Sequence, residues 1–398
     1  PRHRGTGERA AARTELARAL EIDKSLHEAR RVLTDVHASL GEHEYAVEEG
    51  RRYLQSNPDS AAARVRVAQS LMLMGEIDQA LEEVQVIDES QRDVQINYAI
   101  GRIYLAKRDH ENARKYLLAA LEEMPTHAEI LGSLLILDTA MGRVDESAAR
   151  IQAAREASPD DANLERVAGL LALEQGNFGA AEDAFKRALE LDPDDIQNYR
   201  HLAEYYVKTG RTQETIDVYE KALEVEANQP QVHHLLGVLY EYGGQRERAI
   251  EHYEEAVKWA PNQAQSKNNL AYIYAETGQN LDRALDLAQE AKAQLPNDPN
   301  AADTLGWVLY RRGVPSAAIS YLKEAEAGIQ PDDSNLGLVR HHLALAYEAS
   351  GDKERARAAA ERALAAHDEY AEARKASGDP VDDPPEWYAE SLSLRERL

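Results

Sequence analysis

Cysteine is absent from the 398-residue chain, and phenylalanine occurs only twice. The lack of cysteine excludes disulfide bonds, thiolate zinc sites, iron–sulfur clusters and a cysteine nucleophile. No apolar run approaches the roughly 20 residues that span a bilayer, so we expect no direct membrane insertion. Lys and Arg number 46 against 71 Asp and Glu, which gives a net charge of −25. Because nucleic-acid affinity depends mainly on basic side chains, this balance argues against a nucleic-acid partner.

Motifs for catalysis and for cofactor binding are also missing. The sequence has no Gly-rich phosphate loop, no dinucleotide-binding glycine motif, no nucleophile elbow and no H-E-x-x-H zinc motif. The adjacent pairs His233-His234 and His341-His342 are not expected to hold a metal, because neighbouring side chains on a helix point about 100° apart. We expect structural or surface roles for these histidines. The sequence therefore predicts a protein that is not an enzyme and that holds no cofactor and no metal.

What the sequence does contain is a repeat of about 34 residues. Residues 162–195 show it best, with Ala168-Gly169 in a first segment, Gly176 after it, and Phe185 in a second segment. Each repeat has two apolar stripes with the spacing i, i+3, i+4, i+7, which predicts two amphipathic helices. Glycines such as Gly210 fall where the first helix should end. We count ten repeats, starting near His27, Ala61, Val94, Ala128, Ala162, Ile196, Pro230, Ala264, Pro299 and Gly337.

These residues resemble the tetratricopeptide repeat family, whose pattern is W-x2-L-G-x2-Y, then A-x3-F, then P. The resemblance implies an all-α fold, a right-handed superhelical solenoid of about ten helix-turn-helix repeats plus terminal helices. We expect four parts. They are an incomplete repeat with only its second helix in residues 1–26, the ten-repeat solenoid in 27–376, a Pro/Asp linker in 377–385, and a short C-terminal helix or tail in 386–398.

In this family the first helix of each repeat lines a concave groove, and the groove-facing positions can be carried over to this sequence. They give an apolar groove zone made of Val65, Met72, Leu73, Tyr98, Leu105, Ile136, Leu170 and Leu173. They also give a mixed aromatic and polar zone made of His234, Tyr242, Asn268, Tyr272, Asp303, Trp307, Tyr310 and Arg311. The second zone has the composition of a protein-binding hot spot. The alternative is that these residues contact neighbouring helices.

The resemblance implies a non-catalytic scaffold that binds a protein or peptide partner in its groove. The carboxylate clamp of chaperone-binding members is not expected, because Glu204 stands where the clamp needs asparagine and Asn268-Asn269 lack the accompanying lysine. Residues 268–271 and 303–309 are similar to bacterial tetratricopeptide proteins of exopolysaccharide export and outer-membrane assembly, which favours the periplasm or cell envelope over the cytoplasm. Two alternatives stay open: a repeat region of a larger enzyme such as a protein glycosyltransferase, and a self-associating protein that forms filaments through head-to-tail contacts.

Overall fold

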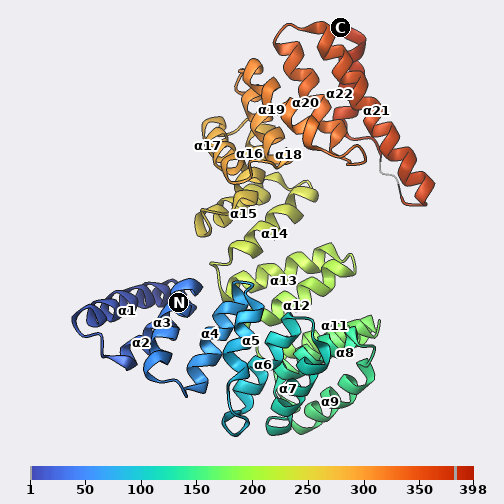
Figure 1. The fold of residues 1–398 in the computed structure, drawn as a ribbon. Coiled ribbons are helices and arrows are strands. Elements are labelled where there is room, and N and C mark those ends of the chain that lie inside the picture. The colour runs from blue at the N-terminus through green and yellow to red at the C-terminus, as the bar shows by residue number, and fades with distance from the viewer. Residues whose placement is uncertain (1, 381–382) are drawn as a thin grey trace. The chain divides into compact units, whose positions relative to one another are not determined.

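The structure is a computed structural model that describes residues 2–380 and 383–398 (Figure 1). Over this part the chain forms 22 α-helices and one 3₁₀ helix, Glu89–Gln91, and no strand, so the predicted all-α fold is confirmed. The α-helices are α1 (Arg2–Ile22), α2 (His27–Ser39), α3 (His43–Ser56), α4 (Ala61–Leu73), α5 (Ile77–Gln85), α6 (Val94–Ala106), α7 (His110–Glu123), α8 (Ala128–Ala140), α9 (Val144–Ala157), α10 (Ala162–Glu174), α11 (Phe178–Leu191), α12 (Ile196–Lys208), α13 (Thr212–Val225), α14 (Pro230–Tyr242), α15 (Arg246–Trp259), α16 (Ala264–Thr277), α17 (Leu281–Gln294), α18 (Pro299–Arg311), α19 (Pro315–Gly328), α20 (Leu336–Ala349), α21 (Lys353–Ser377) and α22 (Glu386–Arg397).

Within each unit described below, consecutive helices pack in pairs, as expected for stacked helix-turn-helix repeats. Each expected repeat begins at the first residue of a helix, except that the tenth begins at Leu336 rather than Gly337. The described residues divide into two compact units, an N-terminal unit up to Thr209 and a C-terminal unit from Gly210. The repeat pattern runs through this boundary without a break and did not predict it. Residues 381 and 382 of the expected linker lie outside the described residues.

A small residue at the eighth position of most repeats allows the paired helices to approach closely. Gly237 on α14 shows the reason, because a Cβ atom there would lie 2.5 Å from Cε1 of Tyr253 on α15. Gly169 on α10 faces Phe185 on α11 at the same distance. A larger side chain at either position would force the two helices apart.

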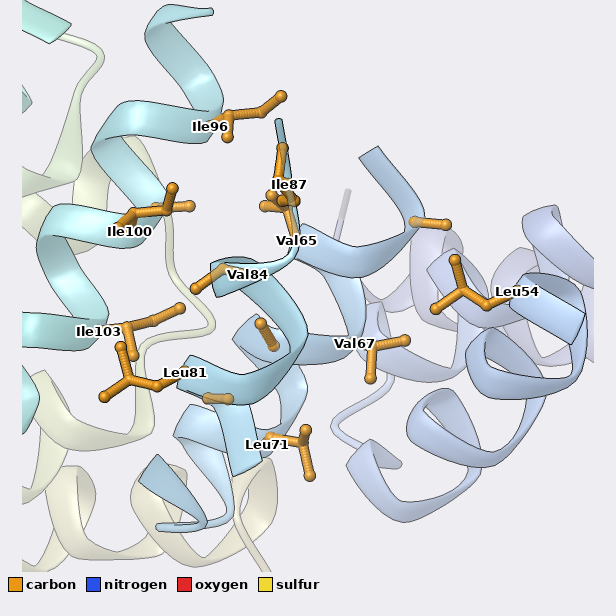
Figure 2. Close-up of a cluster of buried hydrophobic side chains, with 14 of the residues drawn as sticks. Leu54, Val65, Val67, Leu71, Leu81, Val84, Ile87, Ile96, Ile100 and Ile103 are labelled. Carbon is orange, nitrogen blue, oxygen red and sulfur yellow. The ribbon is translucent and has the colours of Figure 1, made fainter. Parts of the chain in front are cut away.

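The paired helices enclose continuous apolar cores. Figure 2 shows one in the N-terminal unit, where α3, α4, α5 and α6 contribute aliphatic side chains. Val67 and Ile103 in this cluster are fully buried. Each such side chain stabilises the fold by about 1.5–3 kcal/mol relative to an exposed one.

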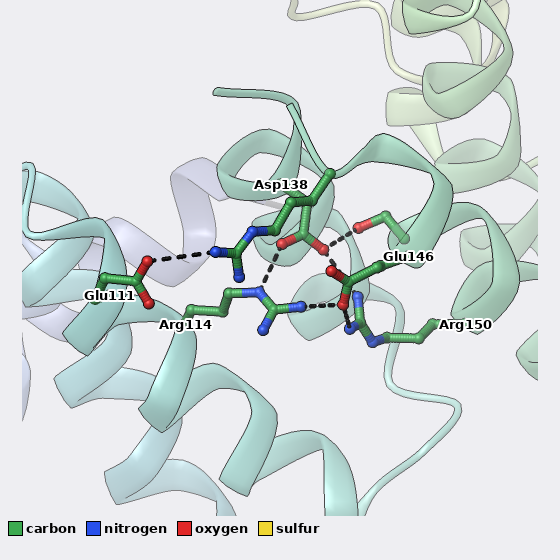
Figure 3. Close-up of polar contacts among 7 residues, drawn as sticks. Glu111, Arg114, Asp138, Glu146 and Arg150 are labelled. Carbon is green, nitrogen blue, oxygen red and sulfur yellow. Dashed lines mark hydrogen bonds and ion pairs between the residues drawn. The ribbon is translucent and has the colours of Figure 1, made fainter. Parts of the chain in front are cut away.

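One repeat of the N-terminal unit buries a charge instead of an aromatic ring (Figure 3). Asp138 on α8 is fully buried and accepts hydrogen bonds from Arg114 Nε (2.9 Å), Arg150 Nη1 (2.8 Å) and Ser147 Oγ (2.7 Å). Arg114 and Arg150 also pair with Glu146 at the surface. The carboxylate is therefore fully partnered, as a buried charge must be.

The last helix, α22, folds back onto the tenth repeat. Its Leu394 is fully buried in the core beside α20 and α21, and Arg397 donates two hydrogen bonds to Glu348, at 3.0 and 2.9 Å. Helix α22 contacts α21 and α20 much as α20 contacts α19 and α18. It thus occupies the position that the first helix of a further repeat would take.

Membrane-spanning helices need both length and an apolar composition. Across residues 2–380 and 383–398, no helix combines the two to the extent that crossing a bilayer requires.

Candidate partner-binding site

A pocket of about 450 Å³ lies in the C-terminal unit, on the surface formed by first helices. The first helices α16, α18 and α20 supply most of its wall, with Tyr272, Trp307 and Arg311 among the lining residues. These three belong to the predicted mixed zone, and the structure brings them together. The remaining wall comes from Arg246 at the start of α15 and from Glu386, Trp387 and Glu390 on α22.

Trp307 forms the buried back of the pocket rather than an exposed anchor. Only 6% of its surface is accessible, and its ring stacks on His342 and Tyr310 with centroids 4.1 and 5.0 Å apart. Its Nε1 donates a hydrogen bond to Glu276 Oε1 (2.7 Å). Arg311 lies over the same ring, 5.5 Å from its centroid, and its Nη1 donates to the main-chain oxygen of Glu276 (3.1 Å). These contacts fix the aromatic wall, so truncating Trp307 would disturb its packing.

Two histidines on α20 hold the far side of the pocket. His342 Nδ1 lies 2.9 Å from Asp303 Oδ1, and both residues are buried, so Asp303 is engaged inside the unit. His341 Nδ1 lies 2.8 Å from Ser391 Oγ on α22. Burial, assisted by the neighbouring His342, lowers the pKa of His341 to about 3, so its ring is neutral near pH 7. Both histidines therefore have structural contacts.

The hydroxyl group of Tyr272 has no hydrogen-bond partner within the described part of the chain. The tyrosine ring is largely buried, 6.3 Å from that of His342. Burial raises the pKa of Tyr272, and the carboxylates of Glu276, Asp303 and Glu241 raise it further, while Arg246 acts in the opposite direction. Three carboxylates and one guanidinium therefore act on this hydroxyl.

The other members of the mixed zone lie outside the pocket. His234 Nδ1 is 3.0 Å from Ser266 Oγ, and Tyr242 at the end of α14 is 89% exposed. Asn268 is half-buried, and its Oδ1 has no hydrogen-bond partner among the described atoms. These residues remain candidates for contact with a longer partner segment.

Sequence models of the tetratricopeptide repeat match five stretches of the chain, which together cover more than half of it. The matches span residues 94–127, 139–196, 172–239, 234–299 and 339–366. The chain belongs to the tetratricopeptide repeat family. The resemblance to this family that the repeat pattern indicated is therefore confirmed. No curated protein sequence matches the chain.

Solved tetratricopeptide repeat structures are similar to this one in fold. YrrB, described as having an unusual peptide-binding site, is 23% identical over 50% of this chain and 97% of its own, with a TM-score of 0.42. Cut9–Hcn1 of the APC/C is 13% identical over 98% and 93%, with a TM-score of 0.43. A tetratricopeptide repeat protein from Parabacteroides merdae is 17% identical over 68% and 98%, with a TM-score of 0.42. Tetratricopeptide repeat proteins bind protein or peptide partners, and this chain is a repeat scaffold for protein interaction.

The predicted apolar groove zone of this tetratricopeptide protein does not form one exposed surface. Val65 is 7% exposed and belongs to the core of Figure 2, which leaves it no surface for a partner. Leu73 and Ile136 are 63% and 66% exposed. The remaining five are partly buried, and four of them pack against the hydrophobic cores: Met72, Tyr98, Leu105, Leu170 and Leu173.

Several pocket residues were not predicted as site residues. Glu276, His341 and His342 lie on first helices, and the adjacent histidine pair was visible in the sequence without any sign of its surroundings. Glu386, Trp387 and Glu390 follow the last repeat, so the repeat pattern assigns them no position. Within the described chain, no group of three or more His, Asp and Glu side chains is arranged to hold a metal ion.

Proposed function

We propose that this tetratricopeptide repeat protein binds a peptide segment of a protein partner in the pocket of the C-terminal unit, without catalysis. The observation that carries the proposal is the pocket itself, because the first helices of three consecutive repeats and α22 converge on one concave site. Aromatic walls with a few convergent polar groups are typical of binding sites and of interface hot spots.

Two features of the pocket support a binding role rather than a catalytic one. Asp303 and His342 are bonded to each other and buried, so this pair does not present a base to a substrate. The lining residues include no serine or threonine hydroxyl that could act as a nucleophile.

A steric block tests the proposal whatever the charge of the partner. Leu338 lines the pocket and is half-buried, so Leu338→Trp places a ring in the space that a peptide would occupy. Partner proteins are captured from an extract of the native source with the intact chain and with the variant. We expect the variant to retain at least about tenfold less partner, which corresponds to about 1.4 kcal/mol.

The matched control places the same ring outside the pocket. Ala365 is exposed on α21, and Ala365→Trp should retain the partner as well as the intact chain does. Helicity and melting temperature are measured for both variants by circular dichroism. Equal retention by Leu338→Trp, with its helicity unchanged, would reject the pocket as the partner site. Trp307→Ala is unsuitable for this test, since it opens a cavity in a buried wall.

A further inference from the structure

We propose that the pocket recognises an arginine side chain within a basic segment of the partner, and that α22 supplies half of that recognition. This inference rests on the proposed function and specifies the chemistry of the partner.

Negative charge prevails in the pocket. Glu276, Glu386 and Glu390 line it, against the guanidinium groups of Arg246 and Arg311. Arg311 is already engaged, because it donates to a main-chain oxygen and lies over the ring of Trp307. Asp303 and Glu241 also act on the Tyr272 hydroxyl beside Glu276, against the single guanidinium of Arg246. A cationic group would therefore be stabilised here and an anionic one repelled.

The two carboxylates from α22 have no cationic partner within the described chain. Glu386 forms no ion pair there. The side chain of Glu390 is 66% exposed and lies 3.2 Å from the neutral ring of His341, while the nearby guanidinium of Arg397 is paired with Glu348. Elsewhere on the described surface many glutamates are paired with arginine, including Glu348 of α20 with Arg397 of α22. The unpaired carboxylates at the pocket rim are thus available to a partner.

An aromatic ring stands beside these carboxylates. Trp387 is half-buried and lies three residues before Glu390, on the same face of α22. The pocket already contains one arginine, Arg311, that lies over the ring of Trp307 and donates a hydrogen bond to a main-chain oxygen at the same time. An arginine from a partner can make the same two contacts with Trp387 and the rim carboxylates. The planar guanidinium suits this arrangement better than the ammonium of lysine.

Long-range electrostatics favour the same partner. The chain carries a net charge of −25, which attracts basic segments and slows the approach of acidic ones.

Four contacts keep α22 in the place where its carboxylates face the pocket. Ser391 bonds to His341, Leu394 is fully buried, and Arg397 pairs with Glu348. At the start of α22, the ring of Trp387 packs directly on Gly337, where a Cβ atom would lie 2.5 Å from Cη2 of the tryptophan. Gly337→Ala is therefore expected to move Trp387 without removing any charged group.

The test uses the full chain and four labelled probe peptides of twelve residues. They share a neutral Ala/Gln/Ser sequence and differ at one central residue, which is arginine, lysine, citrulline or glutamate. Binding is measured by fluorescence polarisation at physiological salt. We expect the arginine peptide to bind at least about tenfold more tightly than the citrulline peptide, which has the same shape without the charge. The glutamate peptide should bind most weakly.

Charge-matched variants locate the interaction. Glu386→Gln with Glu390→Gln should weaken the arginine peptide about tenfold and abolish its advantage over citrulline. The control, Glu369→Gln with Glu396→Gln, removes the same charge from exposed positions of α21 and α22 that do not line the pocket. It should leave the affinity unchanged. Gly337→Ala should lower the affinity for arginine and reduce the preference over lysine, because Trp387 is displaced.

Several results would overturn this inference. They are equal affinity for arginine and citrulline, tighter binding of the glutamate peptide, no binding of any probe, or indifference to the Glu386→Gln, Glu390→Gln change. Partner capture that is lost in Leu338→Trp would still identify the pocket as the partner site. Any of the results above, obtained together with that loss, would reject only the assignment of arginine as the recognised residue. Loss of arginine preference in the control variant as well would show that net charge alone is responsible, and would also reject it.

Discussion

Two helix pairs of this protein, α14–α15 and α8–α9, bury different kinds of residue at the same two repeat positions. In α14–α15, the eighth position is Gly237 and the eleventh is Tyr240, so a ring from each helix fills the space between them. In α8–α9, the corresponding positions hold Leu135 and Asp138. Without the small residue, α8 and α9 pack less closely than α14 and α15 do. The repeat pattern therefore fixes the positions of helices but leaves the contents of each interface to individual residues.

The polar contacts of the two eleventh-position residues differ in a way that matters for stability. Tyr240 is a buried ring whose hydroxyl reaches Glu220 at its edge, with Arg248 4.0 Å above the ring. Asp138 is a buried charge whose partners are two guanidinium groups and a hydroxyl. Removing the carboxylate leaves those partners unsatisfied, whereas removing the tyrosine hydroxyl leaves the ring in place. The following predictions use this contrast.

Asp138→Ala should have the largest effect. Breaking a buried charge pair costs about 3–5 kcal/mol of unfolding free energy, and the N-terminal unit should lose it. Urea unfolding followed by circular dichroism measures the loss. All three tryptophans lie in the C-terminal unit: Trp259, Trp307 and Trp387. The urea midpoint of the fluorescence-detected transition should therefore be unchanged. The control is Asp183→Ala at an exposed position, which should change the stability little. If Asp138→Ala had an equally small effect, the hydrogen bonds and ion pairs of Asp138 would not be stabilising the N-terminal unit.

Leu135→Ala should cost nearly as much. Leu135 is 3% exposed and packs in a cluster with Leu131 and Ile151, so truncation leaves a cavity worth about 2–5 kcal/mol. The adjacent Ile136 is exposed, and Ile136→Ala should change the same circular dichroism transition by less than about 0.5 kcal/mol. If the two variants were equally stable, Leu135 would not be filling the space between α8 and α9.

Gly237→Leu gives α14 the leucine that α8 has at the same repeat position, Leu135. It should lower the unfolding free energy of the C-terminal unit by about 1–3 kcal/mol, because the larger side chain overpacks against Tyr253. The loss should appear in tryptophan fluorescence, since Trp259 belongs to α15 of the same pair. Gly179→Leu is the control, because a Cβ atom at that helical position meets no atom within 4 Å. Gly179 lies in the N-terminal unit, so this control is followed by circular dichroism, as is Gly237→Leu beside it. A Gly237→Leu protein as stable as the intact chain would show that this interface can open without cost.

Tyr240→Phe should have the smallest effect, about 0.5–1.5 kcal/mol, because only one hydrogen bond to Glu220 is lost. Fluorescence-detected urea unfolding gives the value, and it should be well below that of Asp138→Ala. A loss of similar size in the two variants would mean that the hydroxyl, rather than the ring, holds this interface together.

Most of the fold was accessible from the sequence, because it depends on local periodicity. The helix starts from His27 to Pro299 follow from apolar spacing and from glycines and prolines between helices. The unusual interface at Leu135 and Asp138 was not recognised, since two altered letters in one repeat do not disturb that periodicity. Its outcome depends on Arg114 and Arg150, which lie 24 residues before and 12 residues after the aspartate.

The candidate site was only partly accessible for a related reason. Carrying over family positions placed Tyr272, Trp307 and Arg311 in one zone, and the structure brings them to one pocket. The burial of Trp307 follows from His342, which belongs to the next repeat, and a single-repeat pattern contains no such information. The contribution of α22 depends on contacts across about fifty residues, such as His341 with Ser391, which no periodicity signals. The assignment of individual residues to partner binding stays a prediction.

The Asp138 network has a consequence for how these repeats can be rearranged. Arg114 comes from α7 in the third repeat, whereas Asp138 and Arg150 belong to the fourth (Figure 3). If the fourth repeat were moved elsewhere in the array, or the third were replaced by a copy of a different repeat, the buried carboxylate of Asp138 would lose Arg114, one of its two counterions. Repeats that share one pattern are therefore not interchangeable here, because the ionic contacts of Arg114 with Asp138 and Glu146 require the third repeat to precede the fourth.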